Sequence, residues 1–164
     1  MTVRPGVRLA LDWGDARIGV AACDPAATLA YPVRTVQVRG DEGAAIGEIL
    51  TLADEYGPLL EVVMGLPRTL KGKEGPAAQK MRRRAAVLRR RLDPSSGLRL
   101  VDERMTTAAA TRGLHAAGRS TRDQRSVIDQ AAAVAILEYA LTAERATGTP
   151  AGELVPLPDL GDAR

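Results

Sequence analysis

Three acidic residues stand where the sequence predicts buried structure. Asp12 ends an apolar run in LALDWGDARIGVA, and Glu103 ends the run LRLVDE. Asp129 is followed at +3, +4 and +7 by alanine, alanine and isoleucine, so on a helix it shares a face with apolar residues. A carboxylate in apolar surroundings is costly unless it is paired, hydrogen-bonded or bound to a metal. The pattern therefore indicates chemistry that needs buried negative charge.

These acids predict a divalent-cation site if the fold brings them together. Mutual repulsion raises the proton affinity of neighbouring carboxylates, and a cation removes that cost while attracting phosphate oxygens. Oxygen ligands, in a chain with one cysteine and one histidine, favour Mg²⁺ or Mn²⁺ over Zn²⁺. One or two such ions can activate water for phosphodiester hydrolysis. Asp12, Glu103 and Asp129 are therefore the predicted catalytic and metal-binding residues.

Each acid also has a simpler interpretation. Asp12 alone fits a solvated turn equally well. Glu103 could pair with its neighbour Arg104, and Asp129 could pair with Arg125 one helical turn earlier. Spacing along the sequence does not by itself show that the three meet, so these alternatives stay open.

A basic cluster lies between Arg68 and Arg91, where ten Lys or Arg residues accompany a single acid, Glu74. The formal net charge of the chain is only +3, so the distribution matters more than the sum. Such a cluster, which includes Arg82 and Arg83, is typical of a surface that binds nucleic-acid phosphates. The alternative is a solvated helix face that aids solubility.

The elements that must position these residues follow from hydrophobic periodicity. Three apolar strands open the chain, and the third is weakened by Pro32. Helices and strands then alternate, which predicts an α/β fold: a mixed five-stranded sheet, three antiparallel strands followed by αβαβα, with helices on both faces. The expected strands are 7–13, 17–23, 29–38, 59–67 and 97–105, and the expected helices are 41–56, 75–92, 106–118 and 126–144.

Size and composition narrow the class of protein. A chain of 164 residues, 45% hydrophobic and 26% charged, is the size of one globular domain, expected over residues 1–147 with a flexible tail at 148–164. Because the chain has no apolar run long enough to span a membrane and no signal-peptide pattern at its start, we expect a cytoplasmic protein without a membrane partner. Cys23 is the only cysteine and is expected to be a small buried hydrophobe.

Four motifs in order resemble the YqgF family of pre-16S rRNA nucleases and Holliday junction resolvases. They run from about residue 7 to 142 and read DWGDARIGVAACDP, VVMGLPRTLKGKEGP, DERMTT and RSVIDQAAAVAIL. The resemblance implies a ribonuclease H-like fold whose first strand is central. It also implies that Asp12, Glu103 and Asp129 correspond to the family's acidic metal-binding residues.

The resemblance adds candidate nucleic-acid contacts. Arg17 and Arg104 would hold phosphate oxygens, although each could instead neutralise a nearby acid. Thr106 and Thr107 would contact substrate, although capping the next helix is the simpler role for at least one of them.

The segment GLPRTLKGKEGP fits the family's flexible loop, in which Arg68, Lys71 and Lys73 supply charge. Family members often carry an acid or amide where Lys71 stands, so this loop would hold nucleic acid more strongly or read it differently.

Three further residues have a structural interpretation beside a functional one. Gly14 either forms the turn or leaves room for metal or substrate. Trp13 either packs in the sheet or stacks on a base, and packing is favoured. His115 is the only histidine, and surface placement is favoured over general-base chemistry. Cys23 has no predicted role beyond packing.

Three functions compete. The first is a Mg²⁺- or Mn²⁺-dependent nuclease acting on structured RNA, at the 5′ end of pre-16S rRNA, or on branched DNA, where symmetric cleavage of a four-way junction would need a homodimer. The second is a noncatalytic nucleic-acid-binding or transcription-associated factor, which has no reason to keep three buried acids. The third is an actin-like ATPase or sugar kinase, suggested by the Asp-x-Gly hairpin, but those enzymes need two such domains. We favour the nuclease with the RNA substrate.

Overall fold

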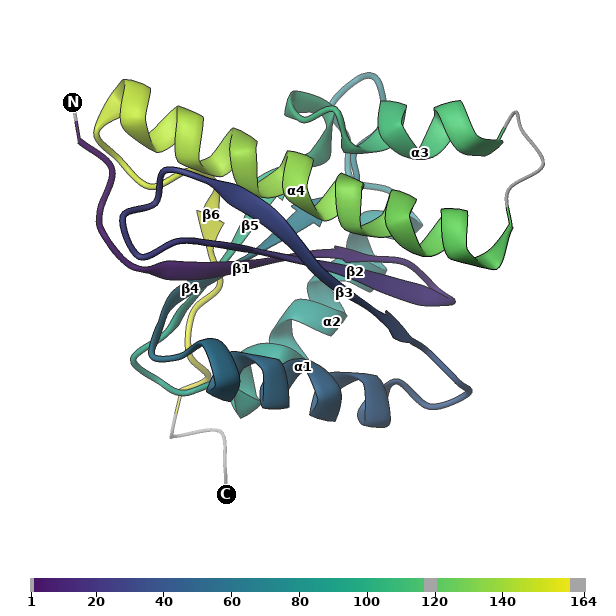
Figure 1. The fold of residues 1–164 in the computed structure, drawn as a ribbon, viewed down its shortest axis with the longest axis horizontal. Helices are drawn as coiled ribbons and strands as arrows, with labels where there is room; N and C mark the ends of the chain where they lie inside the picture. The colour runs from purple at the N-terminus through teal and green to yellow at the C-terminus, as the bar shows by residue number, and fades with distance from the viewer. Residues whose placement is uncertain (1, 117–120, 160–164) are drawn as a thin grey trace.

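The structure is a computed structural model that describes residues 2–116 and 121–159, without the side chains of 114–116. Its central feature is one mixed sheet with helices on both faces (Figure 1). Within the described residues the sheet has six strands in the order β3-β2-β1-β4-β5-β6. The strands are β1 Val7–Trp13, β2 Arg17–Cys23, β3 Ala30–Gln37, β4 Leu59–Leu66, β5 Gly97–Asp102 and β6 Glu153–Leu154.

Strand direction places the ends of three strands beside one another. The strands β1, β2 and β3 form an antiparallel meander, whereas β1, β4 and β5 run parallel. The carboxyl ends of parallel strands meet at the same edge of a sheet, and loops that bind ligands gather there. The predicted mixed α/β sheet with its first strand in an interior position is confirmed, and β1 delivers its last residues to that edge.

The sixth strand comes from the segment predicted to be a flexible tail. β6 pairs antiparallel with β5, and the Val155 N–H donates to the carbonyl of Leu98 at 2.8 Å. Gly152 turns the chain into this strand with a φ of +82°, a conformation that favours glycine. Two exposed residues cannot show an alternating pattern, so the sequence predicted five strands. Residues 160–164 lie outside the described residues.

The helices lie in two layers, α1 and α2 below the sheet in Figure 1 and α3 and α4 above it. Alternate residues of β1 divide between these layers because side chains point to opposite faces at successive positions. Leu9, Leu11 and Trp13 join the cluster packed by α1 and α2, whereas Ala10 joins the cluster packed by α3 and α4. Asp12 therefore faces the α4 layer. The helices are α1 Glu42–Tyr56, α2 Pro76–Arg91, the short 3₁₀ turn η1 Glu103–Met105, α3 Ala108–Ala116 and α4 Arg122–Thr147.

Helix α4 is the longest element and runs along the sheet. A capping box between Thr121 and Gln124 starts it, and Gly148 ends it in the left-handed conformation. By length and composition alone it is apolar enough to cross a membrane. Its buried residues, among them Ile136 and Leu137, instead pack against the strands as part of the core. The predicted helix end at Gly118 lies outside the described residues.

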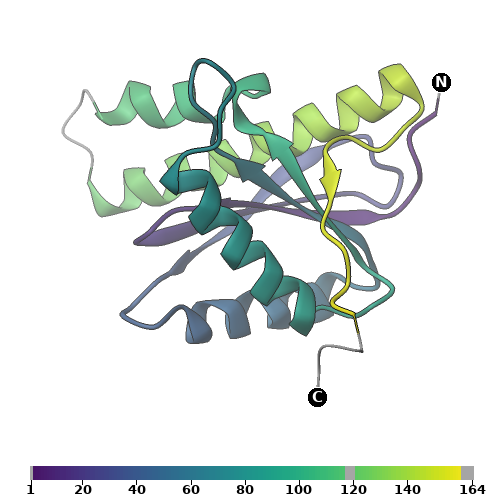
Figure 2. The ribbon, with the colours of Figure 1, turned by 180° about the vertical axis from the view of Figure 1, so that it is seen from behind.

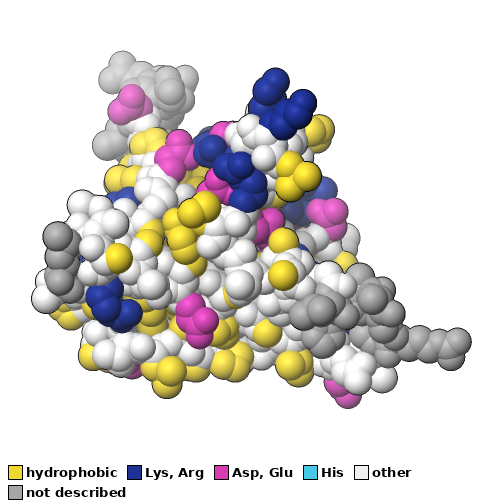
Figure 3. All heavy atoms as spheres, turned by 90° about the horizontal axis from the view of Figure 1, so that it is seen from above, with side chains coloured by type: hydrophobic (Ala, Val, Ile, Leu, Met, Phe, Trp, Pro, Cys, Tyr) yellow, Lys and Arg dark blue, Asp and Glu magenta, His cyan; other side chains and the backbone are white. Residues whose placement is uncertain are grey.

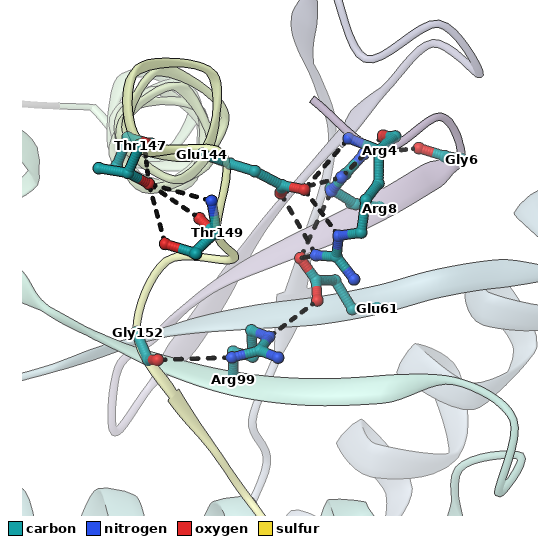
Figure 4. Close-up of polar contacts among 10 residues, drawn as sticks. Arg4, Gly6, Arg8, Glu61, Arg99, Glu144, Thr147, Thr149 and Gly152 are labelled. Atoms are coloured by element: carbon teal, nitrogen blue, oxygen red, sulfur yellow. Dashed lines mark hydrogen bonds and ion pairs between the residues drawn. The ribbon is translucent and has the colours of Figure 1, made fainter. Parts of the chain in front are cut away.

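A buried ion network ties α4 to the sheet at the start of β1 (Figure 4). Arg8 and Glu144 are almost fully buried and pair at 3.2 Å. Glu144 also accepts from Arg4, and Glu61 on β4 accepts from Arg4, Arg8 and Arg99. Every charged group of this network therefore has a partner of opposite sign.

Removing one charge from this network should destabilise the protein strongly. Glu144→Gln leaves Arg8 buried with one carboxylate fewer, so we expect the free energy of unfolding to fall by about 3 kcal/mol in urea denaturation at neutral pH. Glu48→Gln is the matched control, since Glu48 pairs with Arg34 at 3.5 Å on the exposed surface and its loss should change stability by less than about 0.5 kcal/mol. Similar small changes in both variants would contradict this account of the network.

Candidate active site

The three predicted acids line one cleft. Asp12 is the penultimate residue of β1, Glu103 begins η1 directly after β5, and Asp129 lies near the start of α4. The cleft has a volume of about 650 Å³. Its lining comprises Asp12, Trp13, Gly14, Asp15, Ala16, Arg17, Gly65, Pro67, Pro76, Ala77, Lys80, Met81, Arg84, Glu103, Arg112 and Asp129. The prediction that these acids share a site is therefore supported by their positions, and the solvated-turn interpretation of Asp12, which is only 9% exposed, is not.

Glycines bring α4 onto the sheet beside Asp12. Gly19 on β2 is the cross-strand partner of Asp12. A Cβ atom at Gly19 would overlap the backbone carbonyl of Asp129, so α4 rests directly on β2 at this point. At Gly65 on β4, a Cβ atom would lie 3.0 Å from Ile136 of α4 and 3.8 Å from a carboxylate oxygen of Glu103. Positions without side chains thus allow helix and strands to approach closely enough to share a cleft.

Arginine side chains hold the acids as the structure stands. The guanidinium of Arg112 on α3 donates to a carboxylate oxygen of Asp12 and to one of Glu103. The Nε of Arg17 donates to Asp129 at 2.6 Å. Sequence reasoning missed Arg112. Its signal was spacing, because it follows the buried Ala108 by four residues and so lies on the inward face of α3.

Burial and neighbouring acids change the titration of Asp12. Burial raises the pKa of its carboxyl group to about 6, and the nearby charges of Glu103 and Asp129 act in the same direction. The positive charge of Arg112 opposes them without cancelling them. Burial therefore sets the direction of the shift, even though Arg112 contacts the carboxylate of Asp12.

The donor set suits a hard cation. Three carboxylates from three different elements line the cleft, and they offer only oxygen atoms, which favours Mg²⁺ or Mn²⁺. Among the residues that the structure describes, no three His, Cys, Asp or Glu side chains are already gathered closely enough to hold an ion. Arg112 and Arg17 draw the carboxylates toward themselves, so closing around a cation requires these side chains to turn. The chemistry of the residues fits the cation, and in this structure their carboxylates are paired with the arginines.

The simpler pairings proposed for the acids are not found. Arg104 binds the neighbouring Asp102 at 2.6 Å rather than Glu103. Asp129 pairs across the structure with Arg17 rather than with Arg125. Arg17 and Arg104 thus neutralise acids, as one of their two interpretations required.

The basic cluster divides into buried and exposed cations. Arg84 is buried, binds Asp15 and Glu42, and lies over the Trp13 ring at 5.7 Å from its centroid. Arg89 is buried as well and donates to two backbone carbonyls. These arginines hold α2 against the rest of the fold. Trp13 is buried under Arg84, which supports its packing role.

The predicted nucleic-acid contacts lie mostly around the cleft rather than in it. Of the nine, Arg17 alone contributes to the described lining. Arg82 pairs with Glu74 and Glu153, at 2.6 and 2.7 Å. Arg68 lies 3.9 Å from Glu74 and 4.0 Å from Asp102. Lys71, Lys73, Arg83 and Thr107 are exposed, and none of the three cations has an ion pair within the described part of the chain.

Three other residues keep structural roles. Thr106 caps α3, because its hydroxyl oxygen accepts from the N–H of Ala108 at 3.1 Å. The N–H of Gly14 donates to the carbonyl of Arg17 at 2.9 Å, and a Cβ there would approach that oxygen to 2.8 Å, so Gly14 forms the turn. Cys23 is buried at the far end of β2. The side chain of His115 lies outside the described residues.

The face above the sheet carries both signs of charge. Figure 3 views it from above and shows acidic and basic side chains next to one another, with apolar side chains exposed beside them. A surface of this composition can hold cations and phosphates close together.

Comparison with known proteins places this arrangement in context. Residues 6–143 match a family described as RuvX, Holliday junction resolvase. Curated relatives named "Putative pre-16S rRNA nuclease" include one from Streptomyces coelicolor, 56% identical over 92% of this chain and 89% of its own length. Another, from Nocardioides sp., is 53% identical over 93% of this chain and 98% of its own length.

Solved structures share the fold as well, and one of them is informative. It is described as T. thermophilus RuvC in complex with a Holliday junction substrate, and it matches with a TM-score of 0.52 and 14% sequence identity. The match covers 90% of this chain and 99% of that one. At this identity the likeness supports the ribonuclease H-like fold alone.

Removing the charge of Asp12 should change how stability depends on pH. The pKa of Asp12 in the folded protein, about 6, exceeds its ordinary value of 3.8, so the folded protein binds more protons than the unfolded chain between these values. Wild-type stability should therefore fall as pH rises through this range. In EDTA, Asp12→Asn should match the wild type near pH 4 and exceed it by about 3 kcal/mol above pH 7 in chemical denaturation.

The control for this measurement is Asp54→Asn, which changes an exposed acid on α1. Its stability should follow the wild type at every pH. Parallel pH profiles for Asp12→Asn and the wild type would show that folding does not raise the pKa of Asp12.

Proposed function

The chain belongs to the family described as RuvX Holliday junction resolvases, and on that premise we propose that it is a divalent-cation-dependent nuclease that hydrolyses phosphodiester bonds. One observation carries the proposal: Asp12, Glu103 and Asp129 come from three elements far apart in sequence and line a single cleft. A fold that only had to bind a polyanion would gain nothing from three carboxylates in one cleft.

Asp12, Glu103 and Asp129 would hold one or two Mg²⁺ or Mn²⁺ ions. A cation there supplies Lewis-acid activation of water and neutralises charge on the scissile phosphate. The chain's own contribution is to keep Asp12 buried beside the other two carboxylates, where the pKa of about 6 leaves it ionised at neutral pH. The ionised carboxylate of Asp12 would then be able to bind a cation in place of Arg112.

Arg17 and Arg112 bring two guanidinium groups into the same cleft. A guanidinium presents several N–H donors in a plane and suits two phosphate oxygens at once. With the carboxylates bound to a cation, these N–H donors would be free to orient the substrate phosphate. Both arginines therefore act first as partners of the acids and then as partners of the phosphate.

The exposed cations outside the cleft would hold the nucleic-acid backbone. Lys71, Lys73 and Arg83 are exposed and face solvent, whereas Arg84 and Arg89 are committed to the fold. Contacts of this kind position a strand without reading its sequence, and they weaken as salt increases. Arg68, Arg82 and Arg104 would join them by exchanging acidic partners for phosphates.

We favour the 5′ end of pre-16S rRNA as the substrate, in the cytoplasm, following the names of the relatives that cover almost the whole chain. The second candidate substrate is a four-way DNA junction, which the family description favours. Symmetric cleavage of a junction would need a homodimer with two opposed sites, whereas trimming one RNA end needs a single site. A noncatalytic binding factor is the remaining alternative.

A cleavage panel tests the proposal. Wild-type protein with Mn²⁺ should cut labelled precursor rRNA faster than single strands or four-way junctions. Asp12→Asn should lower the rate at least about 100-fold while leaving substrate affinity nearly unchanged, because the variant loses a cation ligand but no phosphate contact. Asp54→Asn again serves as the control and should cut like the wild type.

The possible failures of the panel separate the alternatives. Faster cutting of junctions would assign the DNA substrate. Binding without cutting by the wild type would favour the noncatalytic factor, and undiminished cutting by Asp12→Asn would overturn the proposed role of the three acids.

A further inference from the structure

The loop between β4 and α2 holds a leucine completely in solvent. Leu70 is 99% exposed, more than any other large hydrophobic residue that the structure describes. Full exposure forfeits the stabilisation that burying a leucine side chain contributes. Contact with another molecule would remove this apolar side chain from water. Leu70 is therefore a candidate for a contact outside the chain.

The tip of this loop is a preformed turn. The Thr69 N–H donates to the carbonyl of Lys73 at 2.9 Å, and the Gly72 N–H donates to the carbonyl of Thr69 at 2.8 Å. The Lys73 N–H also donates to the Thr69 hydroxyl at 3.1 Å. Gly72 has a φ of +80°, which completes the turn in a conformation suited to glycine. Leu70 is therefore presented by a built loop, and little order has to be gained when it makes contact.

The loop stands beside the cleft. Its two ends, Pro67 and Pro76, line the cleft together with Asp12 and Glu103. Its tip approaches η1, since a Cβ atom at Gly72 would lie 3.3 Å from the guanidinium of Arg104. Figure 2 shows the loop rising from the start of α2 to the level of α3. The loop that carries Leu70 therefore borders the cleft.

The positive charges around Leu70 indicate which kind of partner it would contact. Lys71 follows it directly, and Arg68 and Lys73 lie within three residues. Cations beside an apolar tip match a nucleic acid, in which phosphates surround bases with apolar faces. Leucine is among the side chains that proteins insert between base steps, which separates the bases locally.

Resting on the proposed nuclease function, we infer that Leu70 is an apolar wedge that packs on an unstacked base next to the phosphodiester in the cleft. The loop then selects substrates whose base stacking is already interrupted, at a branch, a bulge or the end of a helix. Continuous duplexes are disfavoured because their stacked bases must first be separated, which costs free energy. At an interrupted step the bases are already unstacked, so this cost is absent. This selection acts on structure rather than on base sequence.

Fluorescent probes test the wedge without cleavage. All proteins carry Asp12→Asn, and the probes are an RNA duplex with a bulged 2-aminopurine, the same duplex fully paired, and a four-way DNA junction with 2-aminopurine at the branch. Leu70→Ala should lower affinity for the interrupted probes about tenfold and remove the rise in 2-aminopurine fluorescence. Its affinity for the paired duplex should change less than about twofold, because the cations that bind phosphates remain.

Two further variants make the result specific. Leu70→Phe should restore both readouts, since an aromatic ring stacks on a base at least as well. Leu29→Ala, which removes a leucine that is 63% exposed in the loop between β2 and β3, should leave both unchanged. A response to the RNA or the DNA probe alone would identify the nucleic acid for which the wedge is suited.

The wedge would be overturned if Leu70→Ala kept the fluorescence rise and the affinity for interrupted probes, which would assign Leu70 to a protein partner. Equal weakening of all three probes would overturn it too. Because none of these readouts needs cleavage, a wild type that never cuts would refute the nuclease and leave the wedge result standing.

Discussion

The close approach of α4 to β2 is the constraint on which the site depends. Gly19 pairs with Asp12 across the strands, and the backbone of Asp129 fills the space that a side chain on Gly19 would occupy. Gly65 repeats this device on the other side of β1, under Ile136. Without these gaps the helix would stand further from the sheet, and an acid on α4 could not share a cleft with acids at the ends of β1 and β5. Close backbone packing thus helps to bring the three acids to one cleft.

Two groups of buried charged side chains lie on the α4 side of β1, and the pKa values of Glu144 and Asp12, one acid from each group, shift in opposite net directions. At the start of the strand, burial raises the pKa of Glu144, but hydrogen bonds from Arg4 outweigh it and lower that pKa below its ordinary value. Near its end, burial wins and the pKa of Asp12 rises to about 6. The first cluster is saturated with partners and holds the fold together. In the second cluster Arg112 and Arg17 pair with the acids, yet burial still raises the pKa of Asp12 above its ordinary value.

Sequence reasoning succeeded where the signal is local. Two apolar runs joined by a short polar link located β1 and β2, and the apolar neighbours of Asp129 along its helix marked it as a core-facing acid. Sequence reasoning failed where two interacting residues are far apart in the sequence. Nothing near Arg112 showed that it would reach both Asp12 and Glu103, and a count of cations could not tell that Arg84 turns inward while Arg83 stays exposed. The strand β6 has only two residues, too few to show a periodic pattern, so the sequence predicted a flexible tail.

Titration with Mn²⁺, followed by calorimetry, tests most directly whether the contact between α4 and β2 builds a cation site. Wild-type protein should bind the ion, and Gly19→Ala, checked by circular dichroism to be folded, should bind it at least about tenfold more weakly because Asp129 is displaced. Gly47→Ala is the control, since a Cβ atom there meets nothing within 4 Å; it should bind as the wild type does. Equal affinity in the wild type and Gly19→Ala, or no binding by the wild type, would contradict the account.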